Sequence, residues 1–293
     1  MPGREIGSVK RVSWAKMLIS CALPAVLIVG ETGQARADRL ADLVSQCASP
    51  RTAAADVISI CEAALKADDG RLSDQNRAAV HYNAGVAALD MGREVLAEQY
   101  FDNAIQLSPD MAEAWVSRGL AQAAQGRSDA AAASYDGAIA RDPDAPGPFL
   151  ARGRLRAEEG QLSEAVEDYT EALAREPDWE ASYFERGRVL LALGRYGEAE
   201  RDFSAVIARR PRDPGPWLAR GEARAANGVA AALNDFDRAV LLAPEWGAAR
   251  YARGLYLEAA GDADAASADF LRAYQLGHNA PGLQERVRAL SGG

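Results

Sequence analysis

The sequence predicts an all-α protein built from stacked pairs of helices. Glycine recurs at spacings of 34, 34, 34, 34 and 33 residues, and each of these glycines is followed by an alanine and, four positions later, by an aromatic residue. A repeat of this length is typical of helical arrays, in which no unit can bury its apolar face alone and stacked neighbours form a continuous core. The first glycines are Gly85, Gly119, Gly153, Gly187, Gly221 and Gly254, and the alanine–aromatic pairs are Ala97/Phe101, Ala131/Tyr135, Ala165/Tyr169, Ala199/Phe203, Ala232/Phe236 and Ala266/Phe270.

Each unit divides into two helices. The alanine, the aromatic residue and the next small residue are spaced i, i+4 and i+7, which places them on one face of the second helix. A glycine between the two helices is expected to end the first one in the left-handed conformation. These second glycines are Gly92, Gly126, Gly160, Gly194, Gly228 and Gly261. A proline ends each of the first five units at a helix boundary, where the hydrogen bond that its missing N–H cannot donate costs least stability. These prolines are Pro109, Pro143, Pro177, Pro211 and Pro244.

This pattern resembles the tetratricopeptide repeat. Trp115 and Trp217 stand four residues before the first glycine as in that family, with Phe149 and Tyr183 equivalent, whereas His81 and Arg250 depart from the family's pattern in that position. The resemblance implies a right-handed α-solenoid, an all-α fold. Its six repeats are expected at residues 78–111, 112–145, 146–179, 180–213, 214–246 and 247–280.

An arginine precedes the first glycine in five of the six units, where the family usually has an apolar residue. These arginines are Arg118, Arg152, Arg186, Arg220 and Arg253. Asp168, Asp202, Asp235 and Asp269 immediately precede the aromatic residue of the second helix, and Asp136 and Asp237 follow it. We expect arginine–aspartate pairs between stacked helices that fix the register of the units; the alternative is a stripe that binds anions.

Residues 1–37 are expected to be an export signal. They combine a basic start, the apolar run Met17 to Gly30 and the small-x-small site Ala35-Arg36-Ala37, after which cleavage would leave Asp38 first. The predicted location is therefore periplasmic or secreted. An uncleaved anchor in the inner membrane, facing the periplasm, is the alternative. Cys21 ends a lipoprotein-like box, but the apolar run mostly follows this cysteine instead of preceding it.

Cys47 and Cys61 are the two cysteines that remain after cleavage, 14 positions apart. In an oxidising compartment they are expected to form a disulfide, with two buried thiols as the alternative. Residues 38–77 form a degenerate half-repeat or cap, because Val57, Cys61 and Ala64 reproduce the spacing of the second helix. At the other end, residues 281–293 are expected to form a capping helix and a tail.

The composition and the motifs exclude several classes of function. Without residues 1–37, the chain has 28 basic and 40 acidic residues, and such an acidic protein repels nucleic acid. The chain contains no phosphate-binding glycine loop, no HExxH motif and no nucleophile elbow. His81 and His278 are the only histidines, which is too few for an ordinary zinc site. We expect no enzyme activity, no cofactor and no metal.

A stripe on the first helices is the candidate binding surface. The family resemblance implies that these helices line the concave side of the array, and residues at −3 and +1 from the first glycine lie on one helical face. The candidates are Tyr82, Val86, Val116, Leu120, Leu150, Arg154, Phe184, Arg188, Leu218, Glu222 and Tyr251. Such a stripe could hold a peptide by apolar burial, with Arg154 and Arg188 contacting a carboxylate. The alternative is that part of the stripe packs against the second helices.

The expected function is a protein–protein interaction scaffold of the bacterial cell envelope, with a polypeptide partner. A structural or self-associating envelope component is the second hypothesis, and an accessory protein that holds a polymer for an enzyme complex is the third. No membrane span is expected in the mature chain, and the sequence leaves the oligomeric state open.

Overall fold

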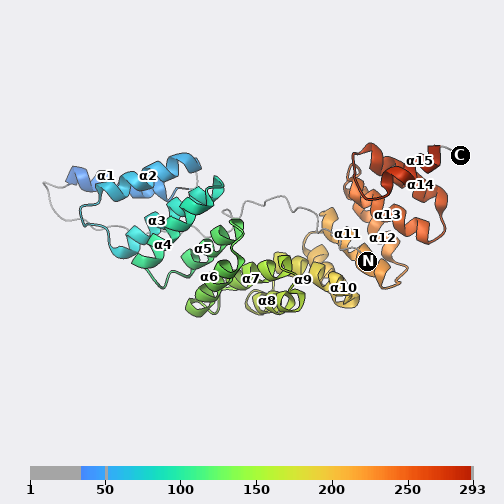
Figure 1. The fold of residues 1–293 in the computed structure, drawn as a ribbon, viewed down its shortest axis with the longest axis horizontal. Helices are drawn as coiled ribbons and strands as arrows, with labels where there is room; N and C mark the ends of the chain where they lie inside the picture. Colours follow the sequence, from blue (N-terminus) through green and yellow to red (C-terminus); the bar gives the residue numbers. More distant parts are fainter. Residues whose placement is uncertain (1–33, 50–51, 292–293) are drawn as a thin grey trace. The chain divides into compact units, whose positions relative to one another are not determined.

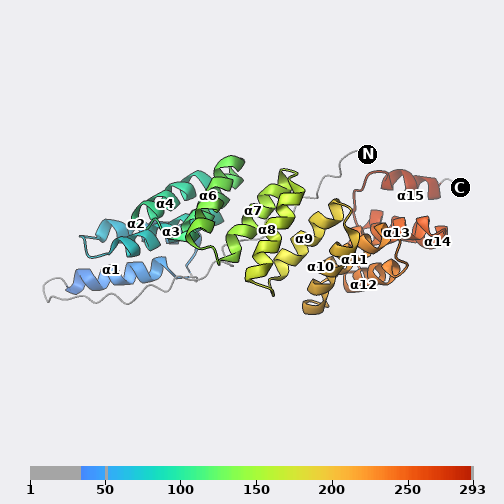
Figure 2. The ribbon, with the colours of Figure 1, turned by 90° about the horizontal axis from the view of Figure 1, so that it is seen from below.

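The computed structural model describes residues 34–49 and 52–291, which form 15 α-helices and no strand (Figures 1 and 2). The all-α prediction is confirmed. None of the helices in this described part is both long enough and apolar enough to cross a membrane. The helices are α1 (Gln34–Cys47), α2 (Ala54–Ala67), α3 (Asp74–Asp90), α4 (Glu94–Leu107), α5 (Ala112–Ala124), α6 (Ser128–Arg141), α7 (Pro146–Glu158), α8 (Leu162–Arg175), α9 (Glu180–Ala192), α10 (Tyr196–Arg209), α11 (Pro214–Ala226), α12 (Ala232–Leu242), α13 (Gly247–Ala259), α14 (Ala263–Gln275) and α15 (Leu283–Ser291).

The helices group into two compact units. Unit 1 ends at Leu155 and unit 2 begins at Arg156, so that the boundary falls near the end of α7. Within each unit, helices that follow one another in the chain pack side by side, for example α3 with α4 and α13 with α14. Six helix pairs, from α3–α4 to α13–α14, lie in the part of the chain where the sequence predicts six repeats.

In five of the repeats, at Gly85, Gly119, Gly187, Gly221 and Gly254, the first glycine makes room for the aromatic ring of the second helix. A Cβ atom added to Gly119 would lie 2.5 Å from Tyr135 Cε1, and one added to Gly187 would lie 2.8 Å from Phe203 Cε1. Both rings are buried. The second glycines have φ between 67° and 87°, which confirms the predicted left-handed helix ends.

Replacing Gly187 by alanine is expected to lower the free energy of unfolding by about 1–3 kcal/mol, because the added methyl group overlaps the buried ring of Phe203. Gly197→Ala is the matched control in the same unit, since no atom lies within 4 Å of a Cβ at Gly197. The control should leave stability unchanged or raise it by up to ~1 kcal/mol. Chemical denaturation followed by circular dichroism measures both, and equal stabilities of the two variants would contradict the packing argument.

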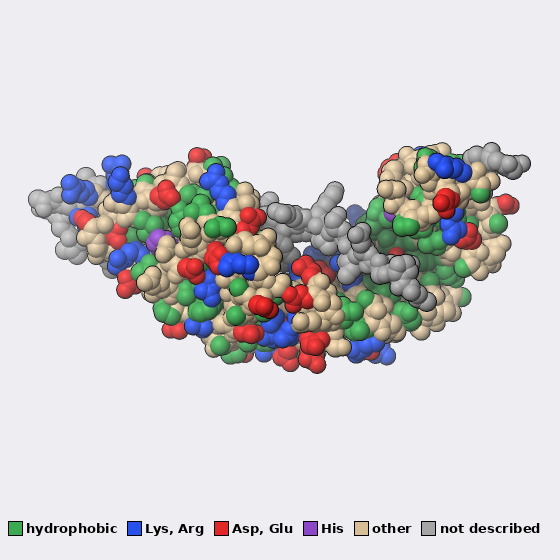
Figure 3. All heavy atoms as spheres, viewed as in Figure 1, with side chains coloured by type: hydrophobic (Ala, Val, Ile, Leu, Met, Phe, Trp, Pro, Cys, Tyr) green, Lys and Arg blue, Asp and Glu red, His purple; other side chains and the backbone are tan. Residues whose placement is uncertain are grey.

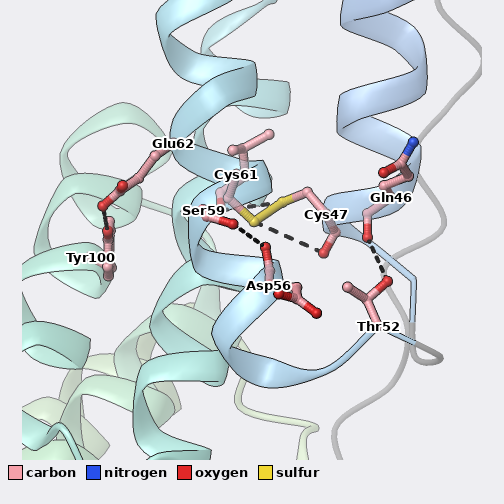
Figure 4. The surroundings of a disulfide bond; sticks show 9 residues. Gln46, Cys47, Thr52, Asp56, Ser59, Cys61, Glu62 and Tyr100 are labelled. Atoms are coloured by element: carbon pink, nitrogen blue, oxygen red, sulfur yellow. Dashed lines mark hydrogen bonds between the residues drawn. A yellow bond between two sulfur atoms is a disulfide. The ribbon is translucent and has the colours of Figure 1, made fainter.

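The amino-terminal cap is a complete helix pair. Cys47, the last residue of α1, is joined by a disulfide to Cys61 of α2, with 5.0 Å between their Cα atoms (Figure 4). Both cysteines are buried among the apolar residues that link α1 and α2 to α3. Most of the expected signal, residues 1–33, lies outside the described residues. Helix α1 begins at Gln34, so cleavage after Ala37 would remove its first turn.

Helix α15 closes the other end of the array. Leu283 and Val287 are buried against Phe270 and Leu257, and α15 lies beside α14 (Figure 1). The repeat that spans residues 214–246 is one residue shorter than the others, between Gly228 and Ala232. Helix α12 begins at the repeat alanine itself and has 11 residues, whereas α10 has 14. The helix therefore loses its first turn, while its apolar face stays in phase.

Candidate functional site

The arginine before the first glycine connects three helices. In unit 2, Arg186 of α9 donates from Nε and Nη2 to the two carboxylate oxygens of Asp202, both at 2.8 Å. Its Nη1 donates to Thr170 of the preceding second helix, α8, at 3.0 Å. These bonds to Asp202 raise the pKa of Arg186. The expected pairing with aspartate is confirmed, and the bond to the preceding repeat is an addition to it.

The same arrangement recurs along the array. Arg220 binds Asp235 with two nitrogens and Ser204 with the third, and Arg253 does the same with Asp269 and Asp237. In unit 1, Arg118 donates to Ser134 and Asp102, and Arg152 pairs with Asp136. The acceptor in the preceding repeat stands 16 positions before the arginine in each case. Asp202, Asp235 and Asp269 are at most 4% exposed, so in unit 2 each of these arginines is neutralised by a buried carboxylate and is not available to an external anion.

A second set of polar side chains lies three positions after the first glycine. Arg224 donates to Glu200 at 2.8 Å and to Asp235 at 2.9 Å. In unit 1, buried Gln122 donates to Glu98 at 2.9 Å and accepts from Ser134 at 2.7 Å. Packing between these helices is therefore partly polar, as the departures from the family pattern indicate.

The hydrogen bonds of Glu98 predict that acid destabilises unit 1. Hydrogen bonding from Arg127, with further bonds from Gln122 and Gln125, lowers the pKa of Glu98 to about 2, although partial burial opposes this shift. A carboxylate with a depressed pKa stabilises the fold above its unfolded pKa of about 4.3, and this contribution is lost as the pH falls towards 2.

Wild-type protein is therefore expected to lose on the order of 1–2 kcal/mol more stability between pH 5 and pH 2 than Glu98→Gln, after a reduction for solvent screening. Urea denaturation at a series of pH values measures this difference. If the free energy of unfolding falls equally with pH in the two proteins, the Glu98 contacts do not form in solution.

In three repeats the residue four positions before the first glycine holds the preceding loop by a hydrogen bond. The indole N–H of Trp115 donates to the carbonyl of Pro109 at 2.9 Å, and that of Trp217 donates to Pro211 at 3.1 Å. Arg250, which departs from the family pattern, donates from Nε to Pro244 at 3.0 Å and so makes the same bond. His81 is half-buried with its ring 6.1 Å from that of Tyr100, and burial lowers its pKa. Both departures thus have structural roles.

The candidate binding residues at −3 belong largely to the packing between helices. Tyr82, Val116 and Leu150 are buried. Phe184, Leu218 and Tyr251 are half-buried. Three of these six side chains contact the aromatic residue of the second helix, with ring centroids 5.8 Å apart for Tyr82–Phe101, 5.8 Å for Phe184–Phe203 and 5.9 Å for Tyr251–Phe270. Tyr251 is also covered by the segment before α15, because its ring lies 5.2 Å from that of His278.

The candidates at +1 are more accessible. Val86, Leu120, Arg154 and Arg188 are partly exposed, and Glu222 is exposed. Arg188 has a nearby carboxylate, since its Nη1 lies 3.4 Å from Glu185. We call these five residues the +1 row. The row is apolar in unit 1 up to Leu120 and charged from Arg154 onward, and Figure 3 shows apolar and charged side chains intermixed over both units.

The described residues contain no group of three or more His, Cys, Asp or Glu side chains arranged to hold a metal ion. Their polar clusters instead join arginines or glutamines to carboxylates and hydroxyls within and between repeats. The arrangement supplies a rigid support for side chains on the first helices, because Arg118, Arg186, Arg220 and Arg253 are each fixed by two or three hydrogen bonds.

Comparisons with known proteins agree on the kind of repeat. A tetratricopeptide-repeat family model matches residues 82–146, 150–214 and 184–228. The chain is similar to the carboxy-terminal part of a repeat protein from Cytophaga hutchinsonii, at 15% identity and TM-score 0.66, over 85% of this chain and 98% of that one. It is also similar to PilF of Pseudomonas aeruginosa, at 16% identity and TM-score 0.62, over 73% and 98% of the two chains.

A third solved structure, YrrB, is described as a tetratricopeptide-repeat protein with an unusual peptide-binding site. It is 20% identical, with TM-score 0.53, over 60% of this chain and 91% of that one. No match was found among curated proteins. At these identities the likeness to solved structures establishes the fold.

Proposed function

This chain carries tetratricopeptide repeats, and from that premise we propose that it is an interaction scaffold of the cell envelope that binds a polypeptide through its first helices. Repeats of this kind are typically non-enzymatic interaction modules. YrrB, a similar structure, is described as having a peptide-binding site, which supports a peptide as the class of ligand.

The accessibility of the +1 row is the observation that carries this proposal. The arginines before the glycines are used inside the array, and the residues at −3 pack on the aromatic rings. The +1 row lies on rigid helices and keeps part of each side chain in solvent. Its apolar members in unit 1 favour an apolar segment of a partner, and Arg188 in unit 2 favours a segment with a carboxylate.

Charge reversal at Arg188 tests the proposal. Arg188→Glu is expected to reduce partner recovery in a pull-down from envelope extract by about tenfold, because a charge-assisted hydrogen bond becomes a repulsion. Arg201→Glu is the matched control, since Arg201 is exposed on the second helix α10 of the same unit. In unit 1, partner recovery with Leu120→Asp is compared with that of the control Val95→Asp. Val95 lies on α4, outside the +1 row, and is 60% exposed. Equal partner recovery with the test and control variants would show that the +1 row does not bind the partner.

The proposed envelope location rests on residues 1–37 and on the cysteine pair. A secretory signal is cleaved during translocation, before the chain folds, so the buried position of Ala37 is compatible with cleavage after it. Mass spectrometry of the protein recovered from its native cells is expected to find Asp38 as the first residue. If the protein is recovered from the cytoplasmic fraction with residues 1–37 still attached, export is excluded.

A further inference from the structure

The last second helix, α14, exposes a position that is buried in four of the five earlier repeats, the exception being the partly exposed Ile139 of α6. Four residues after the aromatic residue, Ile105, Leu173, Ile207 and Val240 are between 7% and 9% exposed, and each belongs to a second helix packed against the first helix of the following repeat. The equivalent residue of α14 is Tyr274, which is 44% exposed. Helix α15 packs near Phe270 and leaves Tyr274 in solvent.

A second position on the same face differs in chemistry. The residue directly after the aromatic residue accepts a hydrogen bond from the next repeat's arginine in the earlier repeats, as Asp102, Thr170, Ser204 and Asp237 show. In α14 this residue is Leu271, which is 43% exposed and cannot accept a hydrogen bond. The face of α14 is therefore unsuited to a further repeat that carries the arginine.

The part of this face around Leu271 carries no charge, and the nearest charged residue on the same stripe of α14 is the exposed Asp264, two turns away. The residues one turn away from Leu271 on α14 are Ser267, Ala268, Tyr274 and Gln275. Like charges that meet across a two-fold axis repel one another, so a surface without charges can pair with its own copy. We call Leu271, Tyr274 and these uncharged neighbours the end face.

We propose that the end face is a dimer interface, where the end faces of two copies of this chain meet about a two-fold axis. A head-to-tail arrangement fits less well, because α1 presents Arg39, Asp42 and Gln46 to solvent, and these side chains would have to be desolvated over Leu271 and Tyr274. Two-fold pairing instead buries an aromatic and a branched apolar side chain from each copy. The patch is small, so the dimer is a weak one.

Sedimentation of the purified chain over a concentration series tests the interface. The wild-type mass is expected to rise towards twice the monomer value, and Leu271→Glu/Tyr274→Glu should weaken dimerisation at least ~30-fold. Leu241→Glu is the matched control, because Leu241 is 68% exposed on α12, outside the end face. A wild-type chain that stays monomeric at all concentrations, or a dimer that the double variant leaves intact, would overturn the proposal.

Cysteine cross-linking distinguishes the two-fold arrangement from other contacts. In a Cys21→Ser background, with Cys47 and Cys61 bridged, Tyr274→Cys is expected to give a covalent dimer on mild oxidation, because a residue at the centre of a two-fold interface lies close to its own copy. Leu241→Cys should remain a monomer. Equal cross-linking of both variants would indicate random collision and would overturn the two-fold interface. This result does not depend on whether the +1 row binds a peptide.

Discussion

Replacing Arg186 by methionine is expected to lower the free energy of unfolding by about 3–5 kcal/mol. Methionine keeps most of the apolar stem but removes the guanidinium group that holds both oxygens of Asp202. Asp202 is 4% exposed, so its carboxylate would remain buried without this partner. The bond to Thr170 of α8 would be lost as well, which weakens the contact between consecutive repeats. Urea denaturation of the two proteins measures the difference.

The double variant Arg186→Met/Asp202→Leu separates the cost of a stranded charge from the value of the pair. Replacing both members of a buried ion pair by apolar side chains of similar volume is often neutral or stabilising. We therefore expect the double variant to recover most of the stability that Arg186→Met loses. If the double variant is as unstable as the single one, the hydrogen bonds themselves, including the one to Thr170, carry the stability.

Removing the disulfide with Cys47→Ala/Cys61→Ala is expected to cost about 3 kcal/mol, the chain-entropy value for a loop of this size. The two alanines keep small apolar side chains at buried positions, so the variant tests the covalent link more than the packing. Because α1 contacts α2 and, to a lesser extent, α3, the loss should be confined to this end of unit 1. Hydrogen exchange of peptides covering residues 34–67 measures it.

The later repeats provide the internal control for the disulfide experiment. Peptides from α9 to α14 should exchange at the wild-type rate, since an array of repeats transmits stability mainly to its nearest neighbours. Faster exchange throughout the chain would show that the cap stabilises all repeats together. Unchanged exchange in α1 and α2 would show that apolar packing alone holds the cap.

The helix pairs could be predicted because their spacing follows from contact geometry. A glycine such as Gly187 is needed where the ring of Phe203 lies against the first helix, and the left-handed turn at Gly194 excludes most other residues. These requirements appear in every repeat, so the sequence displays them as a period. The lost turn of α12 was not predictable, because a one-residue deletion between Gly228 and Ala232 can be absorbed by the loop or by the helix.

The candidate site was predicted less completely. Helical periodicity places Tyr82 and Val86 on neighbouring parts of one face, but it does not show that the ring of Phe101 covers the first of them. The arginine pairs with Asp202, Asp235 and Asp269 were predictable from charge and position. The bonds to the preceding repeat were foreseen at Asp136 and Asp237 but missed for Arg118, Arg186 and Arg220. A sequence signal existed, because Asp102, Thr170 and Ser204 also stand directly after the aromatic residue and 16 positions before the next arginine.

The three-helix arginine connection has a consequence for how such a chain can change its length. Each arginine takes one acceptor from its own repeat and one from the repeat before it. Duplicating a 34-residue stretch such as residues 180–213, wherever the copy is cut, supplies a new arginine together with both sets of acceptors. Gene duplication can therefore extend the array without any compensating substitution, provided that the inserted piece is one full period.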